Sequence, residues 1–159
     1  MNDQPQPPLS IAVIPVTPFQ QNCSLVWCTK TMEAAIVDPG GDVARIRAAL
    51  KETGVKPVAI WLTHGHLDHA GGATELAEAL SLPIIGPHEG DKPLLDALPE
   101  QGLRFEIRDM KAVKPTRWLA EGDNVSVGEI SFAVQHVPGH TPGHVTFFQK
   151  DLRFLLAGD

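Results

Sequence analysis

Short runs of apolar residues, each ended by turn-forming residues, recur along the first third of this chain. Three of them predict strands in an antiparallel arrangement: 11–16, 23–28 and 34–37. A helix should follow, because Val43, Ile46 and Leu50 fall on one helical face. Asp42 stands just before that face, where its side chain could cap the first turn. The chain is therefore predicted to begin with a small antiparallel sheet and one helix.

Strands and helices alternate in the middle of the chain. The apolar run 57–62 predicts a buried strand, the segment 71–80 predicts a helix, and 82–86 predicts another strand. This β-α-β order favours parallel pairing of the two strands. Residues 87–117 are rich in proline and charged side chains, so we expect a surface excursion with one short helix near residues 92–97.

Four short strands joined by turns are predicted in the last quarter of the chain. They cover residues 124–127, 129–136, 144–149 and 152–157. Together with the helices and the parallel segment before them, these strands indicate an α/β (α+β) protein.

Composition limits the domain count and the class of partner. A chain of 159 residues with 43% hydrophobic and 20% charged residues is long enough for one globular domain. We place this domain at residues 11–159, after a flexible Pro- and Gln-rich tail at residues 1–10. The net charge of -6, without a basic run, argues against nucleic acid. Without a long apolar run or a signal-peptide pattern, we expect a cytoplasmic protein that does not bind membranes.

Potential metal ligands gather at residues 63–69, which read THGHLDH. Side chains at i and i+2 of an extended segment leave the backbone on the same side, so His64 and His66 can bind one ion. Asp68 and His69 follow where the loop should turn into a helix, and this pair can reach an adjacent ion. Imidazole and carboxylate ligands suit zinc, with iron and manganese as alternatives. The loop also follows a buried strand, where open α/β proteins usually bind ligands.

Five segments together carry a family resemblance: THGHLDH at 63–69, GHTPGH at 139–144, Gly-Asp at 158–159, QNC at 21–23 and VDPGG at 37–41. They resemble the metallo-β-lactamase superfamily, and the glyoxalase II branch is the most similar part of it. The resemblance covers about residues 11–159 and implies an αββα sandwich that is incomplete in its second half.

That resemblance assigns a role to six side chains. The implied ligands are His64, His66 and His140 on a first metal, Asp68 and His69 on a second metal, and Asp159 as a bridge between the two. The cofactor would be two divalent ions, with zinc expected first and iron or manganese as alternatives. The family pattern also places one more histidine downstream of Asp159, so we expect a domain that is C-terminally incomplete.

One sheet should then lack part of its cover. The apolar residues that would be left exposed are Val145, Phe147, Phe148, Phe154, Leu155 and Leu156.

The function implied by the resemblance is hydrolysis of a small-molecule glutathione thioester such as S-lactoylglutathione. A hydroxide that bridges the two metals would attack the carbonyl, and Asp68 would orient it. Two alternatives stay open. The first is a persulfide dioxygenase with one iron bound by His64, His140 and Asp159, and the second is an inactive, truncated metal-binding module. The sequence leaves the oligomeric state open.

Other residues are expected to have supporting roles. Thr63 and Thr141 should anchor their loops through hydroxyl hydrogen bonds, and His144 should be structural or orient a ligand. His88 is expected to be solvated, and Trp61 is expected to lie in the core.

Overall fold

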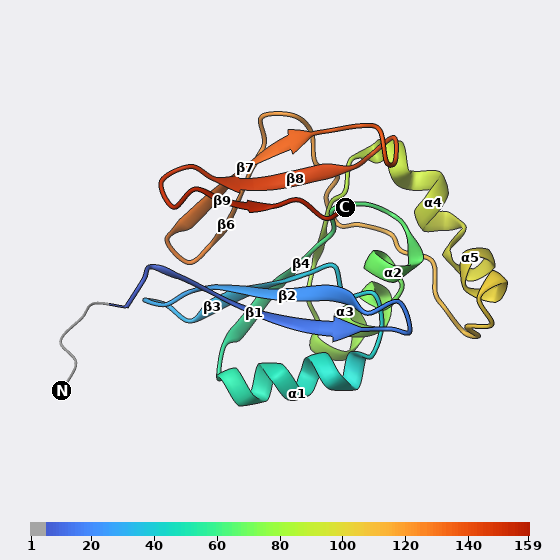
Figure 1. Cartoon of the computed structure of the whole chain (residues 1–159), viewed down its shortest axis with the longest axis horizontal. Coiled ribbons are helices and arrows are strands. Elements are labelled where there is room, and N and C mark those ends of the chain that lie inside the picture. Colours follow the sequence, from blue (N-terminus) through green and yellow to red (C-terminus); the bar gives the residue numbers. More distant parts are fainter. Residues whose placement is uncertain (1–5) are drawn as a thin grey trace.

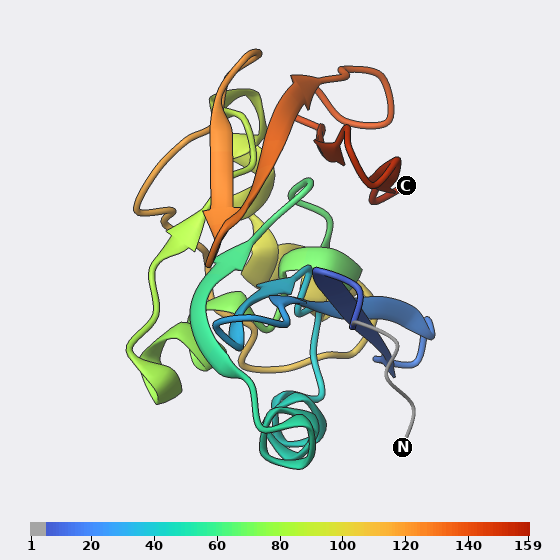
Figure 2. The same ribbon diagram turned by 90° about the vertical axis from the view of Figure 1, so that its left-hand side faces the viewer.

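Two β-sheets stack face to face, and helices cover the outer face of one of them (Figure 1 and Figure 2). This computed structural model describes residues 6–159, and residues 1–5 of the expected tail lie outside the described part. The first strand begins at Leu9, because Leu9 and Ser10 already pair with Cys28 and Trp27. The sheet therefore starts two residues earlier than expected, and the rest of the division into tail and domain stays a prediction.

The first sheet combines antiparallel and parallel strands, as the sequence predicts. Its strands, in spatial order, are β1 (Leu9–Val16), β2 (Gln21–Cys28), β3 (Glu33–Val37), β4 (Lys56–Trp61) and β5 (Ile84–Ile85). The first three strands pair antiparallel, and β3, β4 and β5 pair parallel. The carboxyl ends of β3 and β4 consequently lie side by side. The loop with the histidine motif at residues 63–69 follows the carboxyl end of β4.

Among residues 6–159, six helical segments accompany this sheet. They are α1 (Val43–Thr53), α2 (Leu67–Ala70), α3 (Ala73–Leu80), the 3-10 turn η1 (Glu89–Asp91), α4 (Lys92–Asp96) and α5 (Leu98–Arg104). Buried side chains of α1 and α3 form one core with those of the sheet, and both helices lie on the face away from the second sheet (Figure 1). Within residues 6–159, no helix has the length and apolar character needed to cross a membrane.

Asp42 precedes α1, but the expected side-chain cap is absent there. Its backbone is left-handed, with φ 49°, whereas a capping residue takes up an extended conformation. The Asp42 carboxylate instead accepts a hydrogen bond of 2.7 Å from the backbone N–H of Thr17. This residue therefore connects α1 to the hairpin between β1 and β2.

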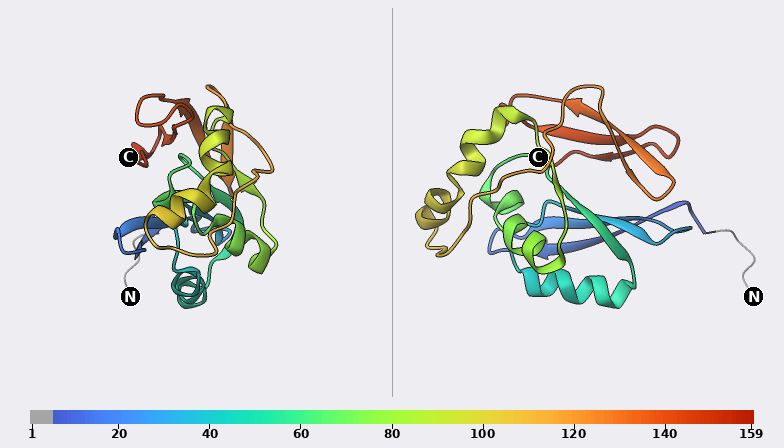
Figure 3. Two further views of the ribbon diagram at one scale, coloured as in Figure 1. Left: turned by 90° about the vertical axis from the view of Figure 1, so that its right-hand side faces the viewer. Right: turned by 180° about the vertical axis from the view of Figure 1, so that it is seen from behind.

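The short helix expected near residues 92–97 is confirmed as α4, but the expectation that residues 87–117 otherwise form a surface excursion is wrong. Two consecutive helices, α4 and α5, lie together at one end of the molecule, and each carries a proline in its first turn, where the missing N–H is tolerated (Figure 3). Leu95, Leu98 and Val113 of this segment are buried in the first core. Their long-range packing outweighs the polar composition on which the expectation rested.

The second sheet is an antiparallel meander. Its strands, in spatial order, are β6 (Asn124–Val127), β7 (Ile130–His136), β8 (Val145–Gln149) and β9 (Phe154–Leu156). Trp61 of the first sheet stacks on Phe147 with ring centroids 5.1 Å apart and meets Phe132 edge-on at 5.3 Å. The expectation that Trp61 lies in the core is confirmed, and these aromatic contacts set how the sheets stack.

The predicted exposure is wrong for three of the six apolar residues named for this sheet, and Phe148 and Phe154 are half-buried. Val145 and Phe147 are fully buried and Leu156 is 8% exposed, because alternate side chains point at the first sheet. Leu155 points outward and is 50% exposed, and outward-facing Ser131 and Ala133 are exposed as well. The described layers are helix, sheet and sheet, in agreement with the expected α/β fold.

Phe132→Ala should destabilise the protein by about 3–5 kcal/mol, because it removes a fully buried ring from between the two sheets. Urea unfolding at equilibrium measures this loss. Leu155→Ala on the outer face of the same sheet is the control and should change stability by about 0.5 kcal/mol or less. Equal losses in the two variants would contradict the described core.

Candidate metal centre

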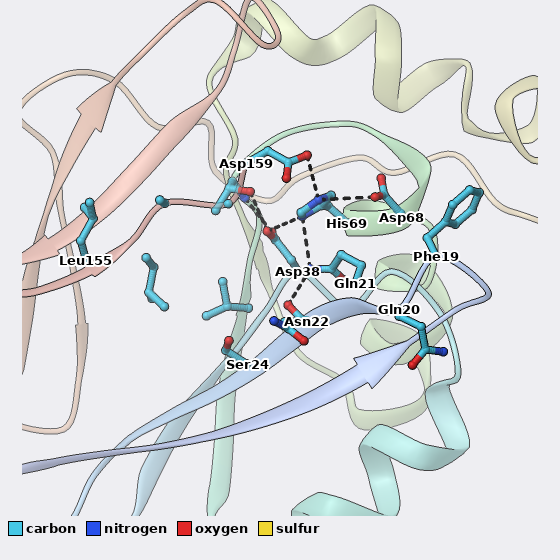
Figure 4. Close-up of a pocket in the computed structure, with 15 residues that line it drawn as sticks. Phe19, Gln20, Gln21, Asn22, Ser24, Asp38, Asp68, His69, Leu155 and Asp159 are labelled. Carbon is cyan, nitrogen blue, oxygen red and sulfur yellow. Dashed lines mark hydrogen bonds and ion pairs between the residues drawn. The ribbon is translucent and has the colours of Figure 1, made fainter.

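The six predicted ligands meet at one end of the two stacked sheets, although they come from three separate loops. His64, His66, Asp68 and His69 follow β4, whereas His140 lies between β7 and β8 and Asp159 follows β9. A backbone hydrogen bond of 2.8 Å from Val145 N to Thr63 O joins the loops of the two sheets. Figure 4 shows Asp68, His69 and Asp159 pointing toward one another above the strands of the first sheet.

His64, His66 and His140 form the first group. One ring nitrogen from each lies within 4.8 Å of the others, a spacing suited to a shared metal ion. His66 Nδ1 and His140 Nε2 are 3.1 Å apart. His64 is fully buried, His66 is half-buried and His140 is exposed, so the group opens toward solvent on one side.

Hydrogen bonding determines which nitrogen of His64 is available. The Thr63 hydroxyl donates its proton to Asp38 Oδ2 at 2.6 Å, so its oxygen can accept from His64 Nδ1–H at 2.9 Å. His64 Nε2 then carries a lone pair, and this atom is buried without a hydrogen-bond partner. Because buried polar atoms are nearly always paired, the orphaned nitrogen fits a metal ion. The predicted anchoring role of Thr63 is confirmed.

His69 shows the same arrangement on the other side of the centre. Its Nδ1 donates to Asp38 Oδ2 at 2.9 Å, which leaves Nε2 3.6 Å from Asp68 Oδ2 and 3.5 Å from Asp159 Oδ2. Asp38 itself lies close enough to His64 and His69 to form a ligand group with them. Its oxygens, however, already accept three hydrogen bonds from Thr63 and His69. We therefore regard Asp38 as a residue that orients the ligands.

Asp159 Oδ2 lies between the two groups. It is 3.0 Å from His140 Nε2 and 3.8 Å from His64 Nε2, in addition to its 3.5 Å separation from His69 Nε2. This position is the one expected of a bridging carboxylate, although the ligand roles themselves stay predictions.

Gly158 makes this position of Asp159 possible. Its φ is +71°, and an added Cβ would lie 2.5 Å from Thr63 Oγ1 and 2.8 Å from His144 Nε2. The same His144 nitrogen accepts the Asp159 backbone N–H at 3.4 Å. His144 is buried, and its contact agrees with the expected structural or orienting role.

Asp91 is a supporting residue that the sequence did not reveal. Its fully buried carboxylate accepts hydrogen bonds from Gly65 N at 2.9 Å, Thr141 Oγ1 at 2.7 Å and Gly143 N at 2.7 Å. It thereby ties the loop of His64 and His66 to the loop of His140. The anchoring role of Thr141 is confirmed. The sequence gives no indication that Asp91 is buried, because it lies in a polar segment whose composition predicts a position on the protein surface.

His88 is less exposed to solvent than expected. Its side chain is half-buried, and its ring stacks on that of His136 with centroids 3.9 Å apart and planes 6° apart. His88 Nδ1 also accepts the Gly90 backbone N–H at 2.9 Å, so this side chain stabilises the turn before Asp91.

Burial favours the neutral, metal-binding form of several histidines. It lowers the pKa of His64 to about 2, and the neighbouring His69, His144, His66 and His140 add to this effect. Burial also lowers the pKa of His66 and His144. For His69, burial acts in the same direction, but the hydrogen bond and charge of Asp38, together with the charges of Asp68 and Asp159, outweigh it, so its pKa is raised.

Two cavities open on this centre. One has a volume of about 390 Å³, extends along β2 past Gln21, Asn22 and Ser24, and ends at Asp68 and Asp159 (Figure 4). The other, of about 360 Å³, also contains Asp68 and Asp159 but extends past His66 and His140 toward the end of α5. Both volumes lie in the usual range for small-molecule sites.

The model of the metallo-beta-lactamase superfamily matches residues 16–159. The chain belongs to this superfamily. Hydroxyacylglutathione hydrolase GloC of Haemophilus influenzae is 41% identical over 152 residues, which span 95% of this chain and 71% of the relative. Probable metallo-hydrolase YqgX of Bacillus subtilis is 33% identical and is covered over 68% of its length. The expected similarity to the glyoxalase II branch is therefore confirmed.

Solved structures of the superfamily share the fold. The crystal structure of TTHA1623 in a di-iron-bound form superposes with a TM-score of 0.81 at 34% identity, over 92% of this chain and 70% of the other. The crystal structure of BLEG-1 B3 metallo-beta-lactamase also gives 0.81, at 31% identity over 93% and 71%. The expected metallo-β-lactamase-type fold is confirmed, and the chain carries a His/Asp cluster suited to a metal ion.

Asp91→Asn should weaken metal binding by about ten-fold or more, because it disturbs the contact that holds the loops of His64 and His140 together. Competition with a chromophoric chelator measures the affinity. Asp96→Asn, which removes an exposed carboxylate from α4, is the control and should bind metal like the wild type. Unchanged affinity in Asp91→Asn would show that the loops keep their positions without this carboxylate.

Stability of the metal-free protein should fall as the pH drops below about 6.5, the ordinary pKa of histidine. Below that pH the unfolded chain protonates His64, His66 and His144, whereas the folded state resists protonation because burial lowers their pKa values. His69, whose pKa is raised in the folded state, would stabilise the fold at lower pH, but its effect is opposed by those of three other histidines. Thermal unfolding of chelator-treated protein between about pH 8 and pH 5 measures this trend, and a melting temperature that rises on acidification would contradict it.

Proposed function

We propose that this member of the metallo-β-lactamase superfamily hydrolyses a glutathione thioester such as S-lactoylglutathione, with two zinc ions as cofactor. The observation that carries the proposal is the position of Asp159 Oδ2 within 3.0–3.8 Å of nitrogens from both histidine groups. The relative from Haemophilus influenzae, named a hydroxyacylglutathione hydrolase, supports the same substrate class. We propose further that the substrate is a small molecule and that the protein acts in the cytoplasm.

The protein supplies ligands and orientation for this reaction. Two divalent ions held at the centre would polarise the thioester carbonyl and lower the pKa of a water molecule toward about 7. Asp68 is half-buried beside His69 and can accept a hydrogen bond from the attacking water, which orients it toward the carbonyl carbon. The water oxygen would form a bond to the carbonyl carbon, the carbon–sulfur bond would break, the thiol part would leave as a thiolate, and the protons of the water would pass to solvent. No protein nucleophile takes part.

His64 and His69 contribute through their fixed protonation. Asp38 and Thr63 hold the Nδ1 protons of both rings, so each ring presents an unprotonated Nε2 to the centre. This preorganisation avoids rearrangement of the ligands when an ion binds.

Asp68→Ala should retain metal on His64, His66 and His140 but lose most of its turnover, about 100-fold or more, because the water loses its orienting carboxylate. Elemental analysis of the purified protein measures the metal, and release of thiol from S-lactoylglutathione measures turnover. Glu78→Ala, an exposed carboxylate paired with Lys111 on the protein surface, is the control and should be fully active. The proposed function fails if wild-type protein loaded with zinc releases no thiol.

The persulfide dioxygenase alternative has one observation in its favour. His64, His140 and Asp159 come together as that reaction requires, with Asp159 Oδ2 3.8 Å and 3.0 Å from the two histidines. One iron per chain and oxygen uptake with glutathione persulfide would support it. Two metals per chain and thiol release without oxygen uptake would exclude it in favour of the hydrolase. Neither activity, in protein that still binds metal, would support the inactive module.

A further inference from the structure

The cavity of about 360 Å³ beside the metal centre contains one cationic side chain, Arg104 at the end of α5. It is the only Lys or Arg among the residues that line either of the two cavities. Arg104 forms no ion pair with any residue of the described range 6–159. In a chain of net charge -6, an arginine that faces a cavity without a carboxylate partner is available to an anionic ligand.

Hydrogen bonds fix α5 to the metal-binding loop. Gln101 accepts the backbone N–H of Leu67 at 3.1 Å and donates to the carbonyl oxygens of Leu94 at 2.9 Å and Gly65 at 3.4 Å. Arg104 follows Gln101 by three positions, so both side chains leave the same face of the helix. Arg104 is exposed and lines the same cavity as His66 and His140.

Two aromatic rings complete the same cavity. Phe19, from the hairpin between β1 and β2, meets Phe105 at the end of α5 edge-on, with ring centroids 5.1 Å apart and planes at 83°. Both rings are large apolar groups left exposed, 42% and 54% respectively. An exposed aromatic pair next to a cation suits a ligand that has both an organic skeleton and a carboxylate.

The other cavity differs in character. Its polar side chains along β2 are the uncharged Gln21, Asn22 and Ser24, which suit a hydroxyl or a carbonyl group better than a carboxylate. A thioester bound with its carbonyl near Asp68 and Asp159 would have access to both cavities, because both contain these two residues.

We propose that Arg104 binds a carboxylate on the thiol part of the substrate, while Phe19 and Phe105 pack against the skeleton of that part. This inference rests on the proposed thioester hydrolysis and assigns to Arg104 the recognition of the thiol part of the substrate. The acyl group lies in the cavity along β2. Arg104 is therefore a residue of substrate specificity and does not contact the reacting atoms.

Arg104→Gln tests this assignment with two substrates that share the lactoyl group. S-Lactoylglutathione carries carboxylates on its thiol part, and S-lactoyl-N-acetylcysteamine carries none. Loss of one charge-assisted contact should raise KM for the glutathione thioester about ten-fold at unchanged kcat, and should leave both constants unchanged for the neutral thioester. Arg108→Gln is the matched control, because Arg108 lines a different cavity and its substitution removes the same charge.

Binding of S-methylglutathione, which cannot be hydrolysed, provides a measurement that does not depend on activity. Titration calorimetry should show about ten-fold weaker binding to Arg104→Gln than to wild type or Arg108→Gln, at equal metal content. Equal affinities in the three proteins, or equal effects on the two thioesters, would overturn the inference. Failure of the proposed function looks different, because the wild type would then hydrolyse neither thioester.

Discussion

The candidate metal centre depends on one buried carboxylate, that of Asp38 at the end of β3. Its oxygens accept hydrogen bonds from the backbone and hydroxyl of Thr63 and from His69 Nδ1. These bonds determine the protonated nitrogen of His64 and His69, and they also satisfy a charge that would be costly to bury alone. Asp38, which follows β3, therefore determines which ring nitrogen is protonated in His64 and His69, which follow the neighbouring strand β4.

Packing between the sheets places the remaining ligands. Trp61, the last residue of β4, stacks on Phe147 of β8 two residues before the metal-binding loop begins. This contact and the Val145–Thr63 backbone hydrogen bond align the ends of β4 and β8. His140, in the loop between β7 and β8, and Asp159, after β9, are thereby placed beside the histidines that follow β4.

Local patterns explain which parts of the structure the sequence could predict. The i, i+2 spacing of His64 and His66, and the apolar runs of the strands, depend on neighbours in the chain, so they are legible without a structure. Asp91 is different, because its partners Gly65 and Thr141 are 26 and 50 residues away. Burial of a carboxylate by distant donors leaves no periodic signal. The Asp42 side chain was misassigned for the same reason, since its partner Thr17 lies 25 residues away.

Arg104 also falls outside the reach of sequence motifs. A single arginine in a polar segment has no distinctive context, and only the fold shows that it lines the same cavity as His66 and His140. The family resemblance likewise contained no information on this position.

The division of the ligands between two sheets has a consequence for folding. His64, His66 and His69 belong to the first sheet, and His140 and Asp159 belong to the second, so an ion bound by both sets is a cross-link between the layers. An ion bound by both His66 and His140 would close a loop between two residues that are 74 positions apart in the sequence. Metal binding would then stabilise the packing of one sheet on the other, and any change that weakens this packing would weaken metal binding.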